Sequence, residues 1–461
     1  MLRDLTHLRR PEFPMRTIRE TAAALRAMLT SVEALARETG FVQRRSKLTG
    51  QLFVHTLVFG WLADPHIPLE GLCQVAAAFG VRISPQGLAQ RFTPQGAQLL
   101  RQVLERALGI LATVRAEPAL GSLLDRFSAV YVSDCTVVGL PKALAATWPG
   151  CGNARSPAPT SAALKASVRL ELRRGTLHGP LLCPGRTHDQ AAPPPGPAAA
   201  VGALEIADLG YFSLNRFQRL SERGVHWLSR LQIGTRFVVA GQPHTAESFL
   251  PSLTAAAYDG PIALGARHRL PARLVAARVP PEVAQARRRK ARAEARRRGK
   301  TVSRARLATA DWTMLVTTVP ATVLSPDEIG TLYGARWQIE LLFKLWKSGG
   351  GLGHSRSANP DRILCEVYAK LLAMVVQHGV LVATCWQLPD RSLVKAAHTI
   401  RLLAIALALD LEHPVRLATR LVSLRTSLAA GCRLNSRHAH PSTYQRLLAV
   451  QATSFKEGRA A

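Results

Sequence analysis

The sequence predicts an α/β protein in which helical N- and C-terminal regions flank a mixed layer of strands and helices. Leu and Ala recur at helical spacing over residues 16–117, and glycines and prolines interrupt the pattern. From about residue 119 short β-rich runs replace it, and helical spacing returns after residue 325. Together these changes of period predict helical ends around an α/β centre.

The composition indicates a folded protein with a polyanionic partner. The 461 residues suggest about three domains, at ~150 residues each. The chain has 60 Lys and Arg against 30 Asp and Glu, a formal charge of +30, and 47% hydrophobic residues. The hydrophobic fraction excludes a disordered basic tail, and the charge favours DNA, RNA or an anionic surface. Charge alone says nothing about chemistry.

The sequence lacks the signals of a membrane or secreted protein. Its most apolar stretches are interrupted by polar residues such as Gln377 and His378, so none reaches the ~18 apolar residues of a membrane span. Asp4, Arg9 and Arg10 stand where a signal peptide needs an apolar core. We therefore expect a cytoplasmic protein with no membrane partner.

The N-terminal region contains a candidate helix-turn-helix. A helix over 69–79 ends at Gly80, and Ser84 followed by proline has the chemistry of a new helix start. The second helix would carry Gln90 and Arg91 and present them to a DNA groove. An ordinary pair of packed helices is the equally weighted alternative.

The central region predicts strands that end in carboxylates. The expected strands cover residues 128–133, 163–172, 175–183, 202–207 and 226–232, with a helix over 213–224. Asp134 follows the first of these strands and Asp208 follows the fourth. A carboxylate at each strand end would be exposed at the edge of the sheet.

Residues 233–318 interrupt this pattern. They hold further β-like pieces and a basic tract from Arg287 to Arg306, which has eleven Lys or Arg and one Glu, a net charge of +10. The tract is a solvated or disordered loop, a contact to the DNA backbone, or both, with Arg288 and Arg297 among its cations.

A strand over 312–320 and then a helix follow. Ser325 as cap, a proline after it and two acids in the first turn predict a helix that runs to about Ser348. The glycines at 349–351 end it.

This helix concentrates charge on one face. At roughly 100° per residue, Tyr333, Arg336, Glu340 and Lys347 share an arc of about 60°, with Lys344 at its edge. A solvated face with i,i+4 pairs is the alternative interpretation.

The pattern Tyr333-x2-Arg336-x3-Glu340-x6-Lys347 resembles the Y-x2-R-x3-E-x6-K signature of bacterial insertion-sequence DDE transposases, in the hairpin-forming, cut-and-paste group. The surrounding ARWQIELLFKLWKSG is similar to the family as well. Asp208-Leu-Gly-Tyr211 resembles the block around the family's second acid, and Asp134 matches the first. The resemblance covers about residues 120–390.

The resemblance implies an RNase H-like catalytic core, with Asp134, Asp208 and Glu340 as catalytic residues and metal ligands. Glu340 follows Asp208 by 132 residues, a gap that fits a group with a mainly β insertion domain before the glutamate helix. The predicted division is a helical DNA-binding region (1–118), the first part of the core (119–232), the basic β-rich insertion (233–318), the second part of the core (319–388) and a helical C-terminal region (389–461).

Three carboxylates offer hard oxygen ligands for two Mg²⁺ ions, for which Mn²⁺ could substitute. Such a pair activates the attacking water or 3′-hydroxyl and stabilises the leaving 3′-oxygen. Asp125 and Asp189 are the alternatives to Asp134.

Several side chains are expected to contact DNA. Arg336, Lys344 and Lys347 would hold phosphates beside the cut, and Tyr333 could donate to one. By the resemblance, Trp312 would stack on a base flipped from the DNA end. A core tryptophan in a strand is the alternative for Trp312.

The function that the sequence favours is a DNA transposase. It would bind terminal inverted repeats, cut both strands and join the ends to target DNA, as a homodimer on paired ends and associated with the nucleoid. Hairpin ends are implied by the resemblance only. The alternatives are a catalytically inactive DNA-binding descendant, or a nuclease on the same core without strand transfer.

Overall fold

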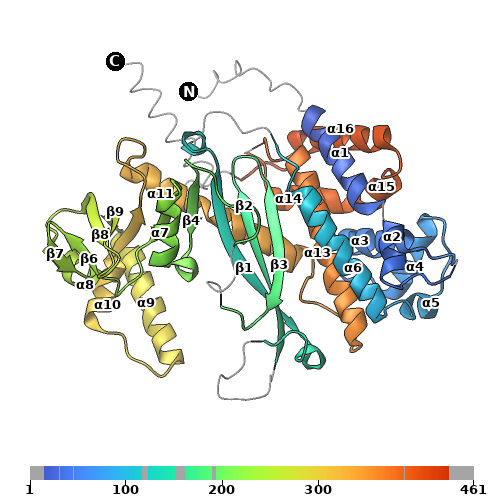
Figure 1. Cartoon of the computed structure of the whole chain (residues 1–461), viewed down its shortest axis with the longest axis horizontal. Coiled ribbons are helices and arrows are strands. Elements are labelled where there is room, and N and C mark those ends of the chain that lie inside the picture. Colours follow the sequence, from blue (N-terminus) through green and yellow to red (C-terminus); the bar gives the residue numbers. More distant parts are fainter. Residues whose placement is uncertain are drawn as a thin grey trace. The chain divides into compact units, whose positions relative to one another are not determined.

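The computed structural model describes residues 15–435, except 31, 45, 117–122, 151–160, 189–193 and 389. The described residues divide into a helix-rich unit and a sheet unit (Figure 1). The helix-rich unit takes its residues from Met1–Leu120, Cys135–Thr187 and Glu340–Arg437. The sheet unit takes its described residues from Gly121–Asp134 and His188–Ile339.

The N-terminal part of the helix-rich unit confirms the helical pattern. Its helices are α1 (Met15–Leu29), α2 (Val32–Glu38), α3 (Gly50–Ala63), α4 (Leu69–Ala78), α5 (Pro85–Ala89) and α6 (Pro94–Leu111). Thr49, Ser84 and Thr93 cap α3, α5 and α6 by accepting hydrogen bonds from backbone N–H groups of the first turn. The expected cap at Ser84 is thus confirmed.

The helix-turn-helix prediction fails at its second helix. α5 has five residues, Gln90 is its C-cap and Arg91 lies beyond it. The guanidinium of Arg91 lies 4.4 Å from the centre of the Phe41 ring and donates to the Phe41 carbonyl at 3.3 Å. Arg91 therefore packs against Phe41 within the helix-rich unit, because α5 ends before Arg91 and the chain after the helix directs this side chain toward Phe41.

The C-terminal helices complete this unit. They are α13 (Pro360–Thr384), α14 (Leu393–Leu402), α15 (Ala404–Leu409) and α16 (Pro414–Ala430), so the region 389–461, expected to be helical, begins with three separate helices. α13 packs against α3, α6 and α16 (Figure 1). It is long and apolar enough to cross a membrane, but its apolar window is wholly buried, as in the central helix of a soluble protein.

The helix-rich unit also contains a hairpin, β2 (Ala162–Glu171) and β3 (Leu177–Pro184), at the strands expected from sequence. β1 (Val130–Leu140) runs from the sheet unit into this one. The strand order recorded for the described residues is β3-β2-β1-β4-β5-β10-β9-β8-β6-β7.

In the sheet unit, β1 pairs in parallel with β4 (Leu204–Ala207), and β4 pairs in parallel with β5 (His226–Arg230). The remaining strands pair antiparallel and are β6 (Phe237–Val239), β7 (Gln242–His244), β8 (Ala257–Leu264), β9 (Leu270–Arg278) and β10 (Trp312–Thr317). α7 (Leu214–Glu222) connects β4 to β5, which is the right length for a parallel crossover. The result is the mixed α/β architecture that the sequence predicts.

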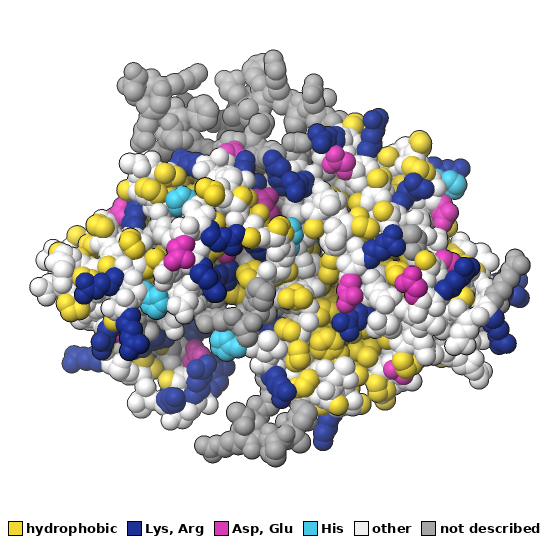
Figure 2. Space-filling model, in the orientation of Figure 1, with side chains coloured by type: hydrophobic (Ala, Val, Ile, Leu, Met, Phe, Trp, Pro, Cys, Tyr) yellow, Lys and Arg dark blue, Asp and Glu magenta, His cyan; other side chains and the backbone are white. Residues whose placement is uncertain are grey.

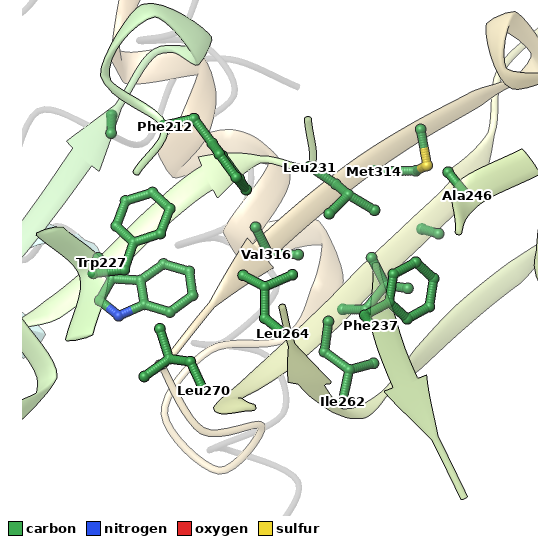
Figure 3. Close-up of a cluster of buried hydrophobic side chains, with 14 of the residues drawn as sticks. Phe212, Trp227, Leu231, Phe237, Ala246, Ile262, Leu264, Leu270, Met314 and Val316 are labelled. Carbon is green, nitrogen blue, oxygen red and sulfur yellow. The ribbon is translucent and has the colours of Figure 1, made fainter. Parts of the chain in front are cut away.

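Residues 233–318 continue this sheet and share its core. Phe237, Ile262 and Leu264 belong to the same buried cluster as Trp227 of β5, and Figure 3 shows them around the strands. Trp227 stacks on Phe217 of α7 at 4.3 Å between ring centroids. Burial of large aromatic and aliphatic side chains stabilises the fold by ~1.5–3 kcal/mol each. The expected insertion thus packs on the strands before it.

Residues 287–297 of the basic tract lie in a helix, where a solvated loop was one expectation for the whole tract. α9 (Pro281–Arg297) starts with proline at its first position, and the tract consists largely of alanine, arginine and lysine, which favour helices. Its N-terminal half is attached to β10, since Arg287 donates to the Trp312 carbonyl at 2.9 Å and Ala284 is buried.

The expected start of the glutamate helix is confirmed. α11 (Pro326–Ala335) has Ser325 as N-cap and a capping box with Glu328. Glu328 also receives hydrogen bonds of 2.9 and 2.8 Å from Arg126. Burial alone would raise the pKa of Glu328, but the bonds from Arg126 and Ser325 outweigh it and keep the pKa below its usual value.

We expect Glu328→Gln to destabilise the sheet unit by about 1–3 kcal/mol at pH 7, because it removes a buried charge-assisted pair and part of a cap. Because the folded-state pKa is lowered, this stabilisation is present above the unfolded pKa and disappears as pH falls through the folded value. Urea unfolding at pH 7 and at successively lower pH values measures it. Glu294→Gln, which breaks an exposed i,i+4 pair with Arg298, is the matched control and should change stability by less than about 0.5 kcal/mol. Equal stability of Glu328→Gln and wild type at pH 7 would contradict this account.

Candidate active site

Parallel pairing brings two predicted carboxylate positions next to each other. Ser133 of β1 pairs with Ala207 of β4, and the next residues are Asp134 and Asp208. Neighbouring strands lie ~4.8 Å apart, so the two acids occupy adjacent positions. Asp208 follows its strand as expected. Asp134, however, lies inside β1, because that strand continues to Leu140 instead of ending at 133.

Asp208 lies beside an arginine of the predicted signature. Nε of Arg336 is 3.8 Å from Oδ1 of Asp208, and their side chains are 16% and 38% exposed. The Arg336 guanidinium also lies 6.0 Å from the centre of the Tyr333 ring. Burial raises the pKa of Tyr333, partly opposed by the charge of Arg230. The phenol therefore remains a proton donor at neutral pH.

The glutamate helix is interrupted, although the sequence predicts one continuous helix. α11 ends at Ala335, Arg336 forms the break, and α12 (Trp337–Lys344) follows. The Ile339 N–H bonds to the Arg336 carbonyl at 3.2 Å, three residues back, which tightens the chain there. The single 60° arc computed for an ideal helix is therefore wrong as a description of the whole segment.

The remaining signature residues follow in α12 and the π turn after it (Leu345–Gly349). Glu340 is half-buried, whereas Lys344 and Lys347 are exposed. Within the described part of the chain, no group of three or more His, Cys, Asp or Glu side chains is arranged to hold a metal ion. Asp134 and Asp208 are neighbours within the sheet unit, whereas Glu340 belongs to the helix-rich unit.

Arg230 is a site residue that sequence reasoning missed. The register pairs Ala207 with Ser229, so Asp208 and Arg230 are the next residues of parallel neighbours. The guanidinium of Arg230 lies 5.7 Å from the Tyr333 ring centre, and Arg230 is exposed. Arg230 lies inside the strand predicted at 226–232, and only the structure ends that strand at Arg230.

The two tryptophans near this region differ in exposure. Trp312 is 6% exposed within the sheet unit's core, and Arg278 lies over its ring at 5.1 Å. This burial agrees with the alternative interpretation of Trp312 as a core tryptophan. Its stacking on a DNA base stays a prediction. Trp337, by contrast, is 54% exposed beside Arg336.

The other predicted DNA contacts lie in α9 and in the helix-rich unit. Arg288 forms an ion pair with Asp311 inside the sheet unit, whereas Arg297 is exposed near the end of α9. Figure 2 shows Lys and Arg side chains gathered over α9 and α10 (Arg304–Ala308). Gln90 is exposed in the helix-rich unit. Asp189 lies outside the described residues.

Of the alternatives to Asp134, Asp125 lies in a short 3-10 turn (Leu123–Arg126) before β1. It therefore lacks the register with β4 that brings Asp134 next to Asp208.

Comparison with known protein families shows which family this chain belongs to. The model of the transposase DDE domain matches residues 126–376, which is more than half of the chain and includes Asp134, Asp208 and Glu340. The chain belongs to the DDE transposase family.

Insertion-sequence transposases are similar to this chain, two of them over about three quarters of their length and a third over less than half. The transposase for insertion sequence element IS231B of Bacillus thuringiensis subsp. berliner is 26% identical over 370 residues, which cover 75% of this chain and 76% of the relative. The transposase for insertion sequence element IS1151 of Clostridium perfringens is 22% identical over 381 residues, covering 77% and 78%. The putative transposase InsL for insertion sequence element IS186A of Escherichia coli (strain K12) is 30% identical over 168 residues.

Membership of this family makes the protein a transposase of the insertion-sequence type, with DNA as its partner and a metal-dependent nuclease and transferase chemistry. The mixed α/β architecture with helical terminal regions fits a DDE transposase domain.

We expect Arg230→Gln to weaken DNA binding across sequences and to lower the salt slope of the affinity by about 1, because one phosphate contact is lost. Binding is measured without divalent metal over a range of salt concentrations. Arg219→Gln removes an exposed arginine of α7 and is the charge-matched control. Equal slopes for the two variants would show that Arg230 does not contact the backbone.

Proposed function

We propose that this DDE transposase binds the terminal inverted repeats of an insertion sequence, cleaves the element's ends and joins them to target DNA. The observation that carries the proposal is the register of β1 and β4, which makes Asp134 and Asp208 neighbours at a parallel strand pair. In open α/β sheets, ligands bind where the strand order reverses, and β2 and β4 lie on opposite sides of β1. The same arrangement supports an RNase H-like core.

Asp134, Asp208 and Glu340 would hold the catalytic metal, and the donor chemistry fits. Carboxylates are the hard oxygen ligands that Mg²⁺ and Mn²⁺ take, and the exposed fraction of Asp208 leaves its oxygens accessible. Two ions per site, when bound, would supply activation of the attacking oxygen and stabilisation of the leaving 3′-oxygen. Arg336 and Arg230 would offset the charge of the acids until then.

The basic residues of the site would hold the DNA backbone. Arg336 can form paired hydrogen bonds with a phosphate, and the protonated phenol of Tyr333 can donate one more. Lys344 and Lys347 add exposed charges on the glutamate helix. Contacts of this kind fix the scissile phosphate in position but read no sequence.

Recognition of the ends needs further surfaces. The exposed face of α9, including Arg297, is a candidate for backbone contacts, and Gln90 is a candidate for contacts from the helix-rich unit. We propose a homodimer on paired ends, with the domain division given by the resemblance. Cytoplasmic residence and association with the nucleoid follow from a DNA substrate.

We expect Asp134→Asn, Asp208→Asn and Glu340→Gln each to reduce end cleavage by about 10³-fold or more, since each removes several kcal/mol of transition-state stabilisation. DNA binding should remain within a few-fold of wild type. The assay uses a linear duplex carrying the inverted repeats expected to border the coding sequence, with and without Mg²⁺. Asp327→Asn changes an exposed acid in the first turn of α11 and should cleave at the wild-type rate.

The outcomes separate the alternatives. Cleavage by Glu340→Gln at the wild-type rate would overturn the assignment. Binding without Mg²⁺-dependent cleavage by the wild type would indicate an inactive DNA-binding descendant. Cleavage without joining of a pre-cut end would indicate a nuclease.

A further inference from the structure

The glutamate helix ends in an unusual turn that contains a predicted phosphate-binding lysine. Leu345–Gly349 form a π turn, and the Gly350 N–H donates to the Leu345 carbonyl at 2.8 Å, five residues back. A π turn holds more residues than an α turn, so Lys347 leaves the α-helical phase set by Glu340. The direction of Lys347 therefore depends on whether this turn is maintained.

The loop after the turn packs too closely for any residue except glycine. A Cβ on Gly350 would lie 2.6 Å from Sδ of Met374 in α13. A Cβ on Gly351 would lie 2.8 Å from Cβ of Pro65, and Gly351 has φ +56°. Met374 and Pro65 belong to the helix-rich unit, as does the π turn itself, so the loop packs against its own unit.

Basic side chains hold the carbonyls of this loop. Nη1 of Arg401, in the last turn of α14, donates to the Gly349 carbonyl at 2.6 Å. Nζ of Lys370, in α13, donates to the carbonyls of Gly351 at 3.2 Å and His354 at 2.6 Å. Cations are favourable at a helix C-terminus, where carbonyls lack helical partners.

A buried lysine at the position of Lys370 costs desolvation free energy, which a purely structural role would not require. It is 2% exposed, and burial lowers its pKa, opposed by the charges of Glu366 and Asp64. Apolar side chains could fill the same volume without desolvating a charge. A buried cation here is explained if the carbonyls of the loop must be held in one arrangement.

We propose that Arg401 and Lys370 are positioning residues that maintain the π turn and thereby direct Lys347 toward the DNA backbone. The inference rests on the proposed function, because it requires that Lys347 contacts a phosphate. It gives a role to two basic residues outside the signature, on α13 and α14.

The test is a double-mutant cycle between Arg401→Met and Lys347→Ala. The readout is the salt slope of the affinity, measured without divalent metal, for a linear duplex that carries the terminal repeat. A random duplex of equal length serves as the reference. Lys347→Ala should lower the slope by about 1 for the repeat duplex. Arg401→Met should lower it by a similar amount, and the double variant should match Lys347→Ala, since both remove the same contact.

Arg391→Met is the matched control. Arg391 also holds carbonyls at a helix end in the same unit, those of Leu428 and Ala429 at 3.2 Å, but at α16. It removes the same charge and should leave the slope unchanged. Arg401→Lys keeps a donor for the Gly349 carbonyl and should restore most of the slope, which also guards against a variant that simply misfolds.

Each result decides the proposal. Additive effects of Arg401→Met and Lys347→Ala, or equal effects of Arg401→Met and Arg391→Met, would overturn the positioning role while the transposase function stands. An unchanged slope for Lys347→Ala would overturn both the phosphate contact and this inference. Mg²⁺-dependent cleavage by the wild type tests the function separately.

Discussion

The parallel pairing of β1 with β4 is the constraint on which the arrangement of this site depends. It makes neighbours of Asp134 and Asp208, which are 74 residues apart in the chain. A shift of one residue in this register would turn one of the two side chains to the other face of the sheet. Because the register is set by buried residues such as Val132 and Ile206, the hydrophobic core also fixes the positions of the acids.

Two carboxylates on adjacent strands repel one another, and nearby cations offset this repulsion. Arg336 lies 3.8 Å from Asp208, and Arg230 is the last residue of the next parallel strand, β5. The excess of positive charge is therefore not only a surface property. Arg287 and Arg288 attach α9 to β10 and Asp311, while Arg401 and Lys370 hold the loop after the glutamate helix. The Lys and Arg side chains that remain exposed, mainly on α9, are available to contact DNA.

Local signals in the sequence predicted most of the elements. The caps at Ser84 and Ser325, the strand before Asp208 and the helical termini are all formed, because each depends on a few adjacent residues. The sequence-based predictions are wrong where tertiary contacts determine the backbone conformation. The helix break at Arg336 and the π turn after Lys344 cannot be seen in an ideal 3.6-residue period. Arg230 was missed because its importance comes from a neighbouring strand.

The central claim is that Asp134, Asp208 and Glu340 bind one metal centre. Replacing Mg²⁺ with Fe²⁺ and generating hydroxyl radicals at the bound ion cuts the polypeptide backbone close to its ligands. The account predicts cuts near residues 134, 208 and 340 together, all suppressed by excess Mg²⁺ and all lost in Asp208→Asn. Cuts near only one of these positions, or a pattern that Asp208→Asn leaves unchanged, would contradict it.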